Sequence, residues 1–215
     1  SHAASIAQKM HAADQGDFST RQAHYLCEQA LALSVQGDRA GAKALLEQAI
    51  AAAPDAARAR IELARLQQLM GQPDAVLATL QTLGERAPAA LPLAAPLMVE
   101  AGNATGRQAE VLARLVAHYE QSPSLDVLES IVAMEAANDA TQATARARYV
   151  QHLDKERSLV AAAKWLSAEK LEHEEFHPQI QRALEHAVKP LTRYRCAACG
   201  FEARQHFWQC PGCQT

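Results

Sequence analysis

The spacing of three prolines constrains this 215-residue chain more than any other feature. Pro54 and Pro88 lie 34 residues apart, and Pro123 follows after a further 35. This is the period of a helix-turn-helix repeat, in which each helix pair buries its apolar face only by stacking on its neighbours. We therefore expect an all-α chain built as an array of stacked helix pairs.

A tetratricopeptide template, which has this period, fits two consecutive segments of the chain. When Pro54 is the last marked position of the first segment, the residues at the sites where paired helices touch are Ala30, Ala42, Leu46 and Ala49. One period later the corresponding residues are Leu63, Ala64, Val76, Leu80 and Leu83. Gly37 and Gly71 are then equivalent turns between helices. The sequence predicts a tetratricopeptide-type α-solenoid.

A third unit over residues 91–123 keeps the period but departs from the template. Pro92 and Pro96 are expected to interrupt its first helix, because proline lacks the N–H group that a helix interior uses. We place the turn of this unit at Gly102-Asn103.

Apolar spacing predicts the remaining helices. Residues 125–157 form a fourth helix pair around an Asn138-Asp139 turn. Stacked repeats need capped ends, so helices are expected over 3–13, as part of an earlier repeat, and over 159–176 and 178–188. The predicted divisions are a partial repeat or N-terminal helix over 1–22, about four repeats over 23–157, and capping helices with a linker over 158–192.

Composition and charge exclude several functions. Hydrophobic residues make up 49% of the chain but aromatic residues only 5%, as expected for closely packed small-residue helices. The 21 Lys and Arg against 24 Asp and Glu give a formal charge of −3, which disfavours binding nucleic acid through the whole surface. No run approaches the roughly 20 apolar residues of a membrane span. Ser1-His2 resembles a cloning remnant, so we expect the natural protein to begin earlier.

Four of the five cysteines form two C-x-x-C pairs near the C-terminal end. Cys196 and Cys199 are separated by ten residues from Cys210 and Cys213, a spacing that places four thiolates tetrahedrally around one metal ion. A disulfide framework would spread its cysteines along the chain, so we expect a reducing, cytosolic compartment. The module over 193–215 is too small to fold without its ion, for which Zn²⁺ is expected and iron is possible.

Other residues of this module have expected roles around the ion. Four thiolates with a divalent ion carry a net charge of −2, which Arg193, Arg195 and Arg204 would compensate. Apolar cover for the module, or a docking face on it, would come from Phe201, Phe207 and Trp208.

The segment His173-Glu174-Glu175-Phe176-His177 matches the H-E-x-x-H motif of zinc peptidases. Pro178 biases His177 away from helical geometry, and Ala183 stands where the extended signature has a third histidine. The context therefore argues against a peptidase, although other candidates for a third ligand are Glu185 and His186.

Repeat arrays bind partners along the concave surface that the first helix of each pair lines. In the template, the candidate residues of this surface are His24, Cys27, Leu31, Arg58, Ile61 and Arg65. Arg58 and Arg65 are seven residues apart and so share a helix face. They are predicted to receive an acidic segment of a partner or of this chain's own metal module. The alternative is that both are solvated charges.

Two stretches, together with the repeats that lie between them, resemble the lipopolysaccharide assembly protein B family of Gram-negative bacteria. The two stretches are residues 23–31, with the sequence AHYLCEQAL, and residues 194–213, which contain both cysteine pairs and are the more specific part. The resemblance covers nearly the whole chain. It implies cytoplasmic repeats, a rubredoxin-like metal domain that packs against them and an N-terminal membrane helix, in a protein without enzymatic activity.

The resemblance also implies a function and partners. Members of the family act at the cytoplasmic face of the inner membrane as adaptors that promote degradation of the lipid A deacetylase LpxC by the membrane protease FtsH. We expect no nucleic-acid partner, and membrane contact only through an anchor that precedes these residues. The family continues past Thr215, so both ends are expected to be truncated. A generic repeat-plus-ribbon module of another assembly, or the H-E-x-x-H metallopeptidase, are the alternatives.

Overall fold

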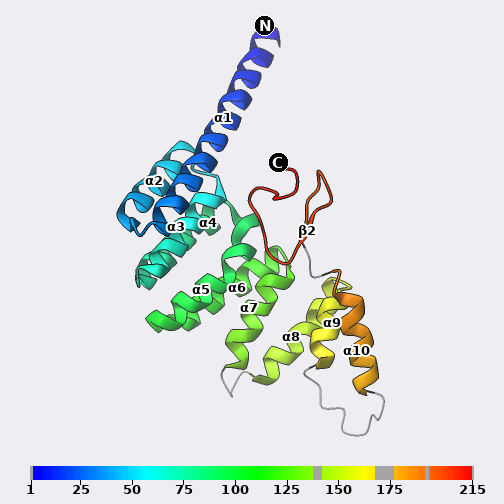
Figure 1. Cartoon of the computed structure of the whole chain (residues 1–215). Helices are drawn as coiled ribbons and strands as arrows, with labels where there is room; N and C mark the ends of the chain where they lie inside the picture. Colours follow the sequence, from blue (N-terminus) through cyan, green and yellow to red (C-terminus); the bar gives the residue numbers. More distant parts are fainter. Residues whose placement is uncertain (1, 138–141, 168–176, 192–193, 215) are drawn as a thin grey trace. The chain divides into compact units, whose positions relative to one another are not determined.

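The computed structural model describes residues 2–137, 142–167, 177–191 and 194–214, and most of them are helical (Figure 1). The predicted all-α, tetratricopeptide-type fold class is confirmed. In chain order the elements are α1 (His2–Val35), α2 (Arg39–Ala52), α3 (Ala57–Leu69), α4 (Pro73–Arg86), the 3-10 helix η1 (Pro88–Ala90), α5 (Leu91–Thr105), α6 (Gln108–Gln121), α7 (Leu125–Ala136), α8 (Gln142–Lys155), α9 (Leu159–Ser167), α10 (His177–Val188), β1 (Tyr194–Arg195) and β2 (Glu202–Ala203).

The chain divides into two compact units, residues 1–113 and 114–215, and each is described by itself. In the first unit, α1 packs on α2, α3 on α4, and α4 on α5. The first helices of successive pairs also touch, α1 with α3 and α3 with α5. Contact between first helices is what stacks one repeat on the next, so the predicted repeat order is visible directly in the packing.

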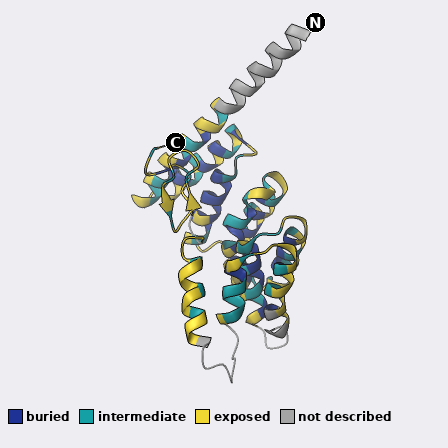
Figure 2. Ribbon diagram, turned by 90° about the vertical axis from the view of Figure 1, so that its right-hand side faces the viewer, coloured by how far each residue is buried: buried dark blue, intermediate teal, exposed yellow. Residues whose placement is uncertain are grey.

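The core of the first unit consists of the small and large residues that the template selected. Ala30, Ala42, Leu46 and Ala49 are buried, and so are Leu63, Ala64, Val76, Leu80 and Leu83 one period later. Figure 2 shows such buried residues along the helix faces that meet one another. Alanine at these sites lets two helix backbones approach closely, while leucine and valine supply most of the apolar area.

The turns repeat with the same period, and they correct one prediction. Gly37, Gly71 and Gly106 have φ angles of +88°, +69° and +70°, a left-handed conformation that glycine adopts without steric cost. The third turn therefore lies at Gly106, and the expected turn at Gly102-Asn103 is wrong. Gly102 lies inside α5, where an added Cβ would stand 2.8 Å from Val111 Cγ2 of α6. Glycine is needed there for close helix packing.

The expected interruption by Pro92 and Pro96 is also wrong, since α5 is continuous over both residues. Pro92 lies in the first turn, where a helix has no use for the missing N–H group. Pro96 lies further along the helix, and because it has no N–H group, one backbone hydrogen bond of α5 is missing there. The fully buried Ala94 and Ala95 lie beside it, in a helix that packs on α3 and α4, and this packing holds the helix together.

The second unit contains the end of α6 from residue 114, helices α7 to α10 and the metal module. Within it α7 packs on α8, α8 on α9, and α9 on α10. Ser124 caps α7 and Ser158 caps α9, each accepting a hydrogen bond from a first-turn N–H group. The expected Asn138-Asp139 turn and residues 168–176 of the expected helix 159–176 lie outside the described residues. Helix α10 begins at His177, and Pro178 occupies its first turn. The expectation that Pro178 keeps His177 out of a helix is therefore wrong.

Helix α1 runs without a break from His2 to Val35, through the expected division at residue 22. Residues 3–13 are therefore continuous with the helix that begins the first repeat. Within the described part of the chain, no helix combines the length and apolar character that crossing a bilayer requires.

Candidate metal centre and partner-binding surface

Two tight turns bring the four cysteines of the C-terminal module together. In the first, the N–H of Gly200 donates to Cys196 O at 2.9 Å, and Gly200 takes a φ of +75°. In the second, the N–H of Gln214 donates to Cys210 O at 2.8 Å, and the N–H of Gly212 donates to Cys210 Sγ at 3.3 Å. The short pairing of β1 with β2, in which Tyr194 lies opposite Ala203, flanks the first turn on both sides.

The sulfur positions match a tetrahedral metal site. All four Sγ atoms lie within 4.8 Å of one another. Cys196 Sγ is 3.8 Å from Cys213 Sγ, and Cys199 Sγ is 3.6 Å from Cys210 Sγ. A Zn–S bond of about 2.3 Å makes the edge of a ZnS₄ tetrahedron about 3.8 Å long. None of the cysteines forms a disulfide in the structure. The four residues therefore fit a divalent ion, and the similar bond lengths of iron leave the metal open.

Local electrostatics shift the pKa values of two of the thiols in opposite directions. Hydrogen bonds from the backbone N–H groups of Cys199 and Ala198 lower the pKa of Cys196. The N–H of Phe201 lowers the pKa of Cys199, but the neighbouring thiols, Cys213 foremost, outweigh it and raise that pKa to about 12. Thiolates this close together repel one another. A divalent ion removes that repulsion and holds all four in the thiolate form.

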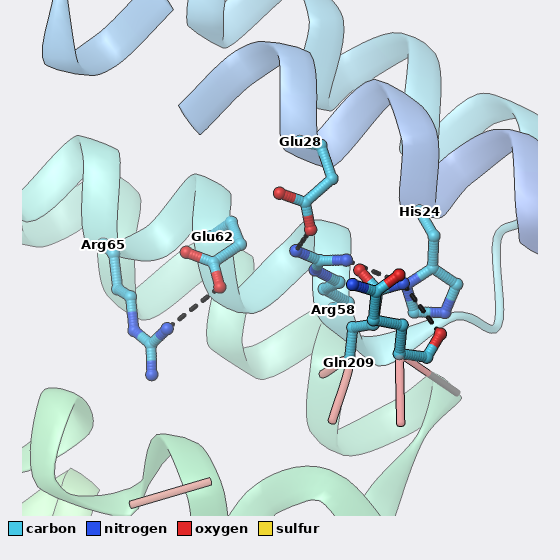
Figure 3. A network of polar contacts seen from close by, with 7 residues as sticks. His24, Glu28, Arg58, Glu62, Arg65 and Gln209 are labelled. Atoms are coloured by element: carbon cyan, nitrogen blue, oxygen red, sulfur yellow. Dashed lines mark hydrogen bonds and ion pairs between the residues drawn. The ribbon is translucent and has the colours of Figure 1, made fainter. Parts of the chain in front are cut away.

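The residues predicted to line a partner-binding groove on the first unit have contacts that differ from those expected. Figure 3 shows Arg58 of α3 between His24 and Glu28 of α1. Arg58 Nη2 pairs with Glu28, and Nη1 donates to His24 Nδ1 at 3.2 Å. Burial, followed by the charge of Arg58, lowers the pKa of His24, so the imidazole is neutral and accepts this bond. The side chain of Arg58 is only 7% exposed. Arg58 is therefore neither a solvated charge nor an exposed cation available to an acidic segment.

Arg65 has the opposite arrangement. Its Nη1 lies 2.9 Å from Glu62 Oε1, and here the base is 54% exposed while the acid is buried (Figure 3). Both arginines therefore have a carboxylate partner within the first unit. Of the six residues predicted for this surface, only Arg65 remains exposed, with His24 and Leu31 half-buried.

Cys27 and Ile61 do not line an open surface, which corrects their assignment to the groove. Cys27 belongs to the hydrophobic core that α1, α2 and α3 share, and Ile61 is 1% exposed. The template placed both residues on the correct helices, but it assigned them to an exposed face although their side chains are buried. Two partners of the arginines, Glu28 and Glu62, were not predicted from the sequence. Each follows another member of the network by four residues, His24 and Arg58 respectively, so helical spacing could have revealed them.

Comparison with known families supports both parts of this description. The family model for the tetratricopeptide repeat matches residues 36–101, and the model for the rubredoxin metal binding domain of LapB, lipopolysaccharide assembly protein B, matches residues 194–215. The chain contains a tetratricopeptide-repeat segment and a LapB-type rubredoxin domain. The resemblance noted from the sequence is thereby confirmed.

Other comparisons add little. Among curated proteins, no sequence matches this chain. A crystal structure of a thermophilic tetratricopeptide protein from Thermus thermophilus is 22% identical, covers 79% of this chain and 93% of its own, and superposes with a TM-score of 0.45. The repeat match and the helix packing establish the fold.

Aromatic residues surround the LapB-type domain without burying it. Phe201 and Phe207 are 40% and 42% exposed, so the expected apolar cover is incomplete. His206 lies edge-on to Tyr194 and Trp208, with ring centroids 5.7 and 4.6 Å away. Of the arginines expected to compensate the thiolates, Arg195 and Arg204 lie on the described module surface and Arg193 lies outside the described residues.

The structure describes only the last residue of the H-E-x-x-H motif. Residues 173–176 lie outside the described residues, and for His177 only its position at the start of α10 is described. The four-cysteine cluster is the potential metal site that the described residues form.

Thiol reactivity should separate Cys27 from the other cysteines. Burial raises the pKa of Cys27 to about 11, and the nearby carboxylates of Glu62 and Glu28 act in the same direction, against the charge of Arg58. Only about a thousandth of this thiol is ionised at pH 8, so it should react very slowly. With a chromogenic disulfide reagent, we expect four fast thiols after chelation and a fifth only in denaturant. Five fast thiols in the folded, chelated chain would contradict this assignment.

Proposed function

We propose that this chain is the cytoplasmic part of a non-enzymatic adaptor that regulates lipopolysaccharide biosynthesis. In this proposal the repeats hold client and protease together at the cytoplasmic face of the bacterial inner membrane. The client is the lipid A deacetylase LpxC, and the protease is the membrane-anchored FtsH. Binding promotes degradation of the deacetylase and so limits lipopolysaccharide output.

The single observation that carries the proposal is the presence of both domains in one chain. Tetratricopeptide repeats are typical of protein-binding scaffolds and are found in many unrelated assemblies. The LapB-type rubredoxin domain is the specific element, because its family model is named for a lipopolysaccharide assembly protein. The repeats therefore support a role in holding other proteins, and the metal domain supports the particular pathway.

Charged side chains on the first unit give the proposed adaptor a surface for partners. Glu28 and Arg65 are each 54% exposed, and each is held in place by a mostly buried ion-pair partner. An exposed charge whose position is fixed by a buried partner loses little conformational entropy on binding. We propose that this preorganised pattern, rather than a row of free arginines, contributes to recognition.

We propose Zn²⁺ as the bound ion, because four-cysteine zinc sites are common structural elements. The residues that would hold it are Cys196, Cys199, Cys210 and Cys213. The ion would supply the folding energy of the domain and no chemistry of its own. Visible absorbance distinguishes the metals, since ferric iron bound to four thiolates is coloured and zinc is not.

Affinity capture from cells tests the adaptor function. A full-length version with its membrane anchor should recover both the deacetylase and the protease, and the double variant Cys196→Ser, Cys199→Ser should lose at least one of them. Cys27→Ser is the matched control, because Cys27 lies in the repeat core and not at the metal. The deacetylase should also persist longer in cells that carry the double variant.

Two results would contradict the proposal. Equal recovery of both proteins by the wild type and the double variant would show that the metal domain has no part in the assembly. Unchanged lifetime of the deacetylase in cells without the adaptor would show that the chain serves another system.

A further inference from the structure

We infer that Cys199 is an oxidation site, at which a hydroperoxide converts two of the clustered thiolates into a disulfide and so releases the metal ion. Zn²⁺ has no redox chemistry in proteins, so the electrons for this reaction come from the sulfur atoms. A cysteine is susceptible to oxidation when it is an exposed thiolate, and a second cysteine within reach completes the disulfide. The four-cysteine cluster meets these conditions at one pair of its sulfur atoms.

The two cysteine turns differ in how well they shield their sulfur atoms. In the first turn Cys199 is exposed, and so are Ala197 and Ala198, whose side chains are too small to cover it. In the second turn Cys210 is only 9% exposed, and its Sγ accepts a hydrogen bond of 3.3 Å from the N–H of Gly212. A small solute in water therefore reaches Cys199 more readily than Cys210.

Cys210 is placed to complete the disulfide with Cys199. Their Sγ atoms lie 3.6 Å apart, whereas Cys196 Sγ and Cys213 Sγ lie 3.8 Å apart. An S–S bond of about 2.05 Å requires Cys199 Sγ and Cys210 Sγ to approach each other by only about 1.5 Å. The exposed sulfur thus has its reaction partner in the better shielded turn.

The reaction balances with a hydroperoxide as the oxidant. The Cys199 thiolate attacks one oxygen of HO–OH, which forms a sulfenic acid and releases hydroxide. The Cys210 thiolate then attacks the sulfur of Cys199, so that the S–S bond forms and a second hydroxide leaves. Two electrons pass from the sulfur atoms to the peroxide, and two protons from solvent convert the hydroxides to water. Only the thiolates of Cys196 and Cys213 remain as ligands, too few for a structural four-cysteine site, and the ion is released.

Arg195 lies beside the exposed turn. A Cβ added to Gly200 would be 3.5 Å from Arg195 Nη2, so the guanidinium lies against the residue that follows Cys199. A cation at this position stabilises the hydroxide that leaves when the thiolate is oxidised. Arg204 is the matched comparison within the same module, because it lines a different hollow, beside Asp126 of α7.

Treatment of the full, Zn²⁺-loaded chain with hydrogen peroxide tests the inference. Release of the ion is followed with a chromogenic chelator, and samples taken at half-release are alkylated in denaturant, digested with trypsin and mapped by mass spectrometry. Trypsin cleaves after Arg204, so the two cysteine turns fall on different peptides, 196–204 and 205–215. A disulfide between Cys199 and Cys210 joins these peptides, whereas a disulfide within one turn leaves them separate.

The joined peptide should appear in step with the released ion, and it should carry alkyl groups on Cys196 and Cys213. Cys27 should stay reduced throughout, because it lies in the repeat core. Arg195→Gln should slow the release about threefold, as expected for the loss of one exposed charge interaction. Arg204→Gln should release the ion at the rate of the unsubstituted chain.

Each of three mapping results would overturn the inference. Peptides 196–204 and 205–215 that stay separate at half-release would show that the first disulfide forms within a turn. An alkyl group on Cys199 in the joined peptide would show that another sulfur reacts first. Retention of the ion while Cys27 becomes oxidised would show that the cluster is not the sensitive group. Equal rates for Arg195→Gln and Arg204→Gln would refute the part given to Arg195.

One consequence of the oxidation rests on the proposed adaptor function. Capture from peroxide-treated cells should lose the same partner as the double variant Cys196→Ser, Cys199→Ser, and a reducing agent with Zn²⁺ should restore it. Intact capture by the oxidised domain would refute this consequence, whereas the disulfide mapped on the purified chain would still establish the site. Failure of capture from untreated cells as well would refute only the proposed clients.

Discussion

Replacing Cys210 by serine should remove the metal ion and unfold the LapB-type domain, while leaving the repeats folded. Cys210 is the most buried of the four cysteines and is paired by distance with Cys199. A structural Zn²⁺ contributes on the order of 10 kcal/mol to the folding of a small metal domain, far more than two short strands and a few exposed rings can supply. No other substitution in the chain should have a larger local effect.

Two measurements on Cys210→Ser check this result. Mass spectrometry under native conditions should show loss of the ion, and the indole signal of Trp208 should move to its unfolded position. The far-ultraviolet circular dichroism should fall by less than about 10%, because the described part of the domain has no helix and the repeats have their own core. Cys27→Ser should keep the ion. Parallel loss of helical signal and metal would contradict the independence of the repeats.

The second large effect should come from Glu135→Ala, which breaks a buried ion pair between α7 and α8. Glu135 is 4% exposed, and its Oε1 lies 2.8 Å from Arg148 Nη2, with a second contact of 3.2 Å from Nε to Oε2. The hydrogen bond to Glu135 is also the main cause that raises the pKa of Arg148. Removing the acid leaves a partly buried guanidinium without this partner, which costs about 3–5 kcal/mol.

Chemical denaturation measures this cost, and the chain supplies a matched control. Lys43 and Glu47 form an ion pair on the outer face of α2, at 3.7 Å and with both side chains about half exposed. Glu47→Ala should change the free energy of unfolding by less than about 0.5 kcal/mol, as expected for a solvated pair. The double variant Glu135→Leu, Arg148→Leu should recover most of the stability, because it leaves no unpaired charge. Similar effects of Glu135→Ala and Glu47→Ala would contradict the structure.

The repeats were predictable because their signals are local and periodic. Prolines at intervals of 34 and 35 residues marked the repeats, and the alanine and leucine sites one period apart are buried as the template requires. The third unit was misread because Pro96 and Gly102 break local rules for helices. Tertiary packing overrode both: α5 packs on α3 and α4 around Ala94 and Ala95, and Gly102 admits Val111.

The metal cluster was predictable from the sequence, whereas the contacts and burial of the residues assigned to the partner-binding surface were not. Two C-x-x-C pairs at this spacing bring four sulfurs together in almost any fold that closes the loop between them. Pairing of Arg58 with His24 and Glu28, however, joins residues about 30 positions apart through the stacking of α1 on α3. A template identifies the helices of a concave surface, but side-chain partners depend on the angle and register at which the helices meet. This is why Cys27 and Ile61 were placed on the surface although they are buried.

Native mass spectrometry of the purified, unsubstituted chain shows whether the four clustered cysteines bind one metal ion. We expect one divalent ion per chain, with four cysteine protons displaced and only the buried Cys27 remaining as a thiol. A folded chain of unmodified mass, with all four clustered thiols open to titration and a Trp208 signal still in its folded position, would contradict it.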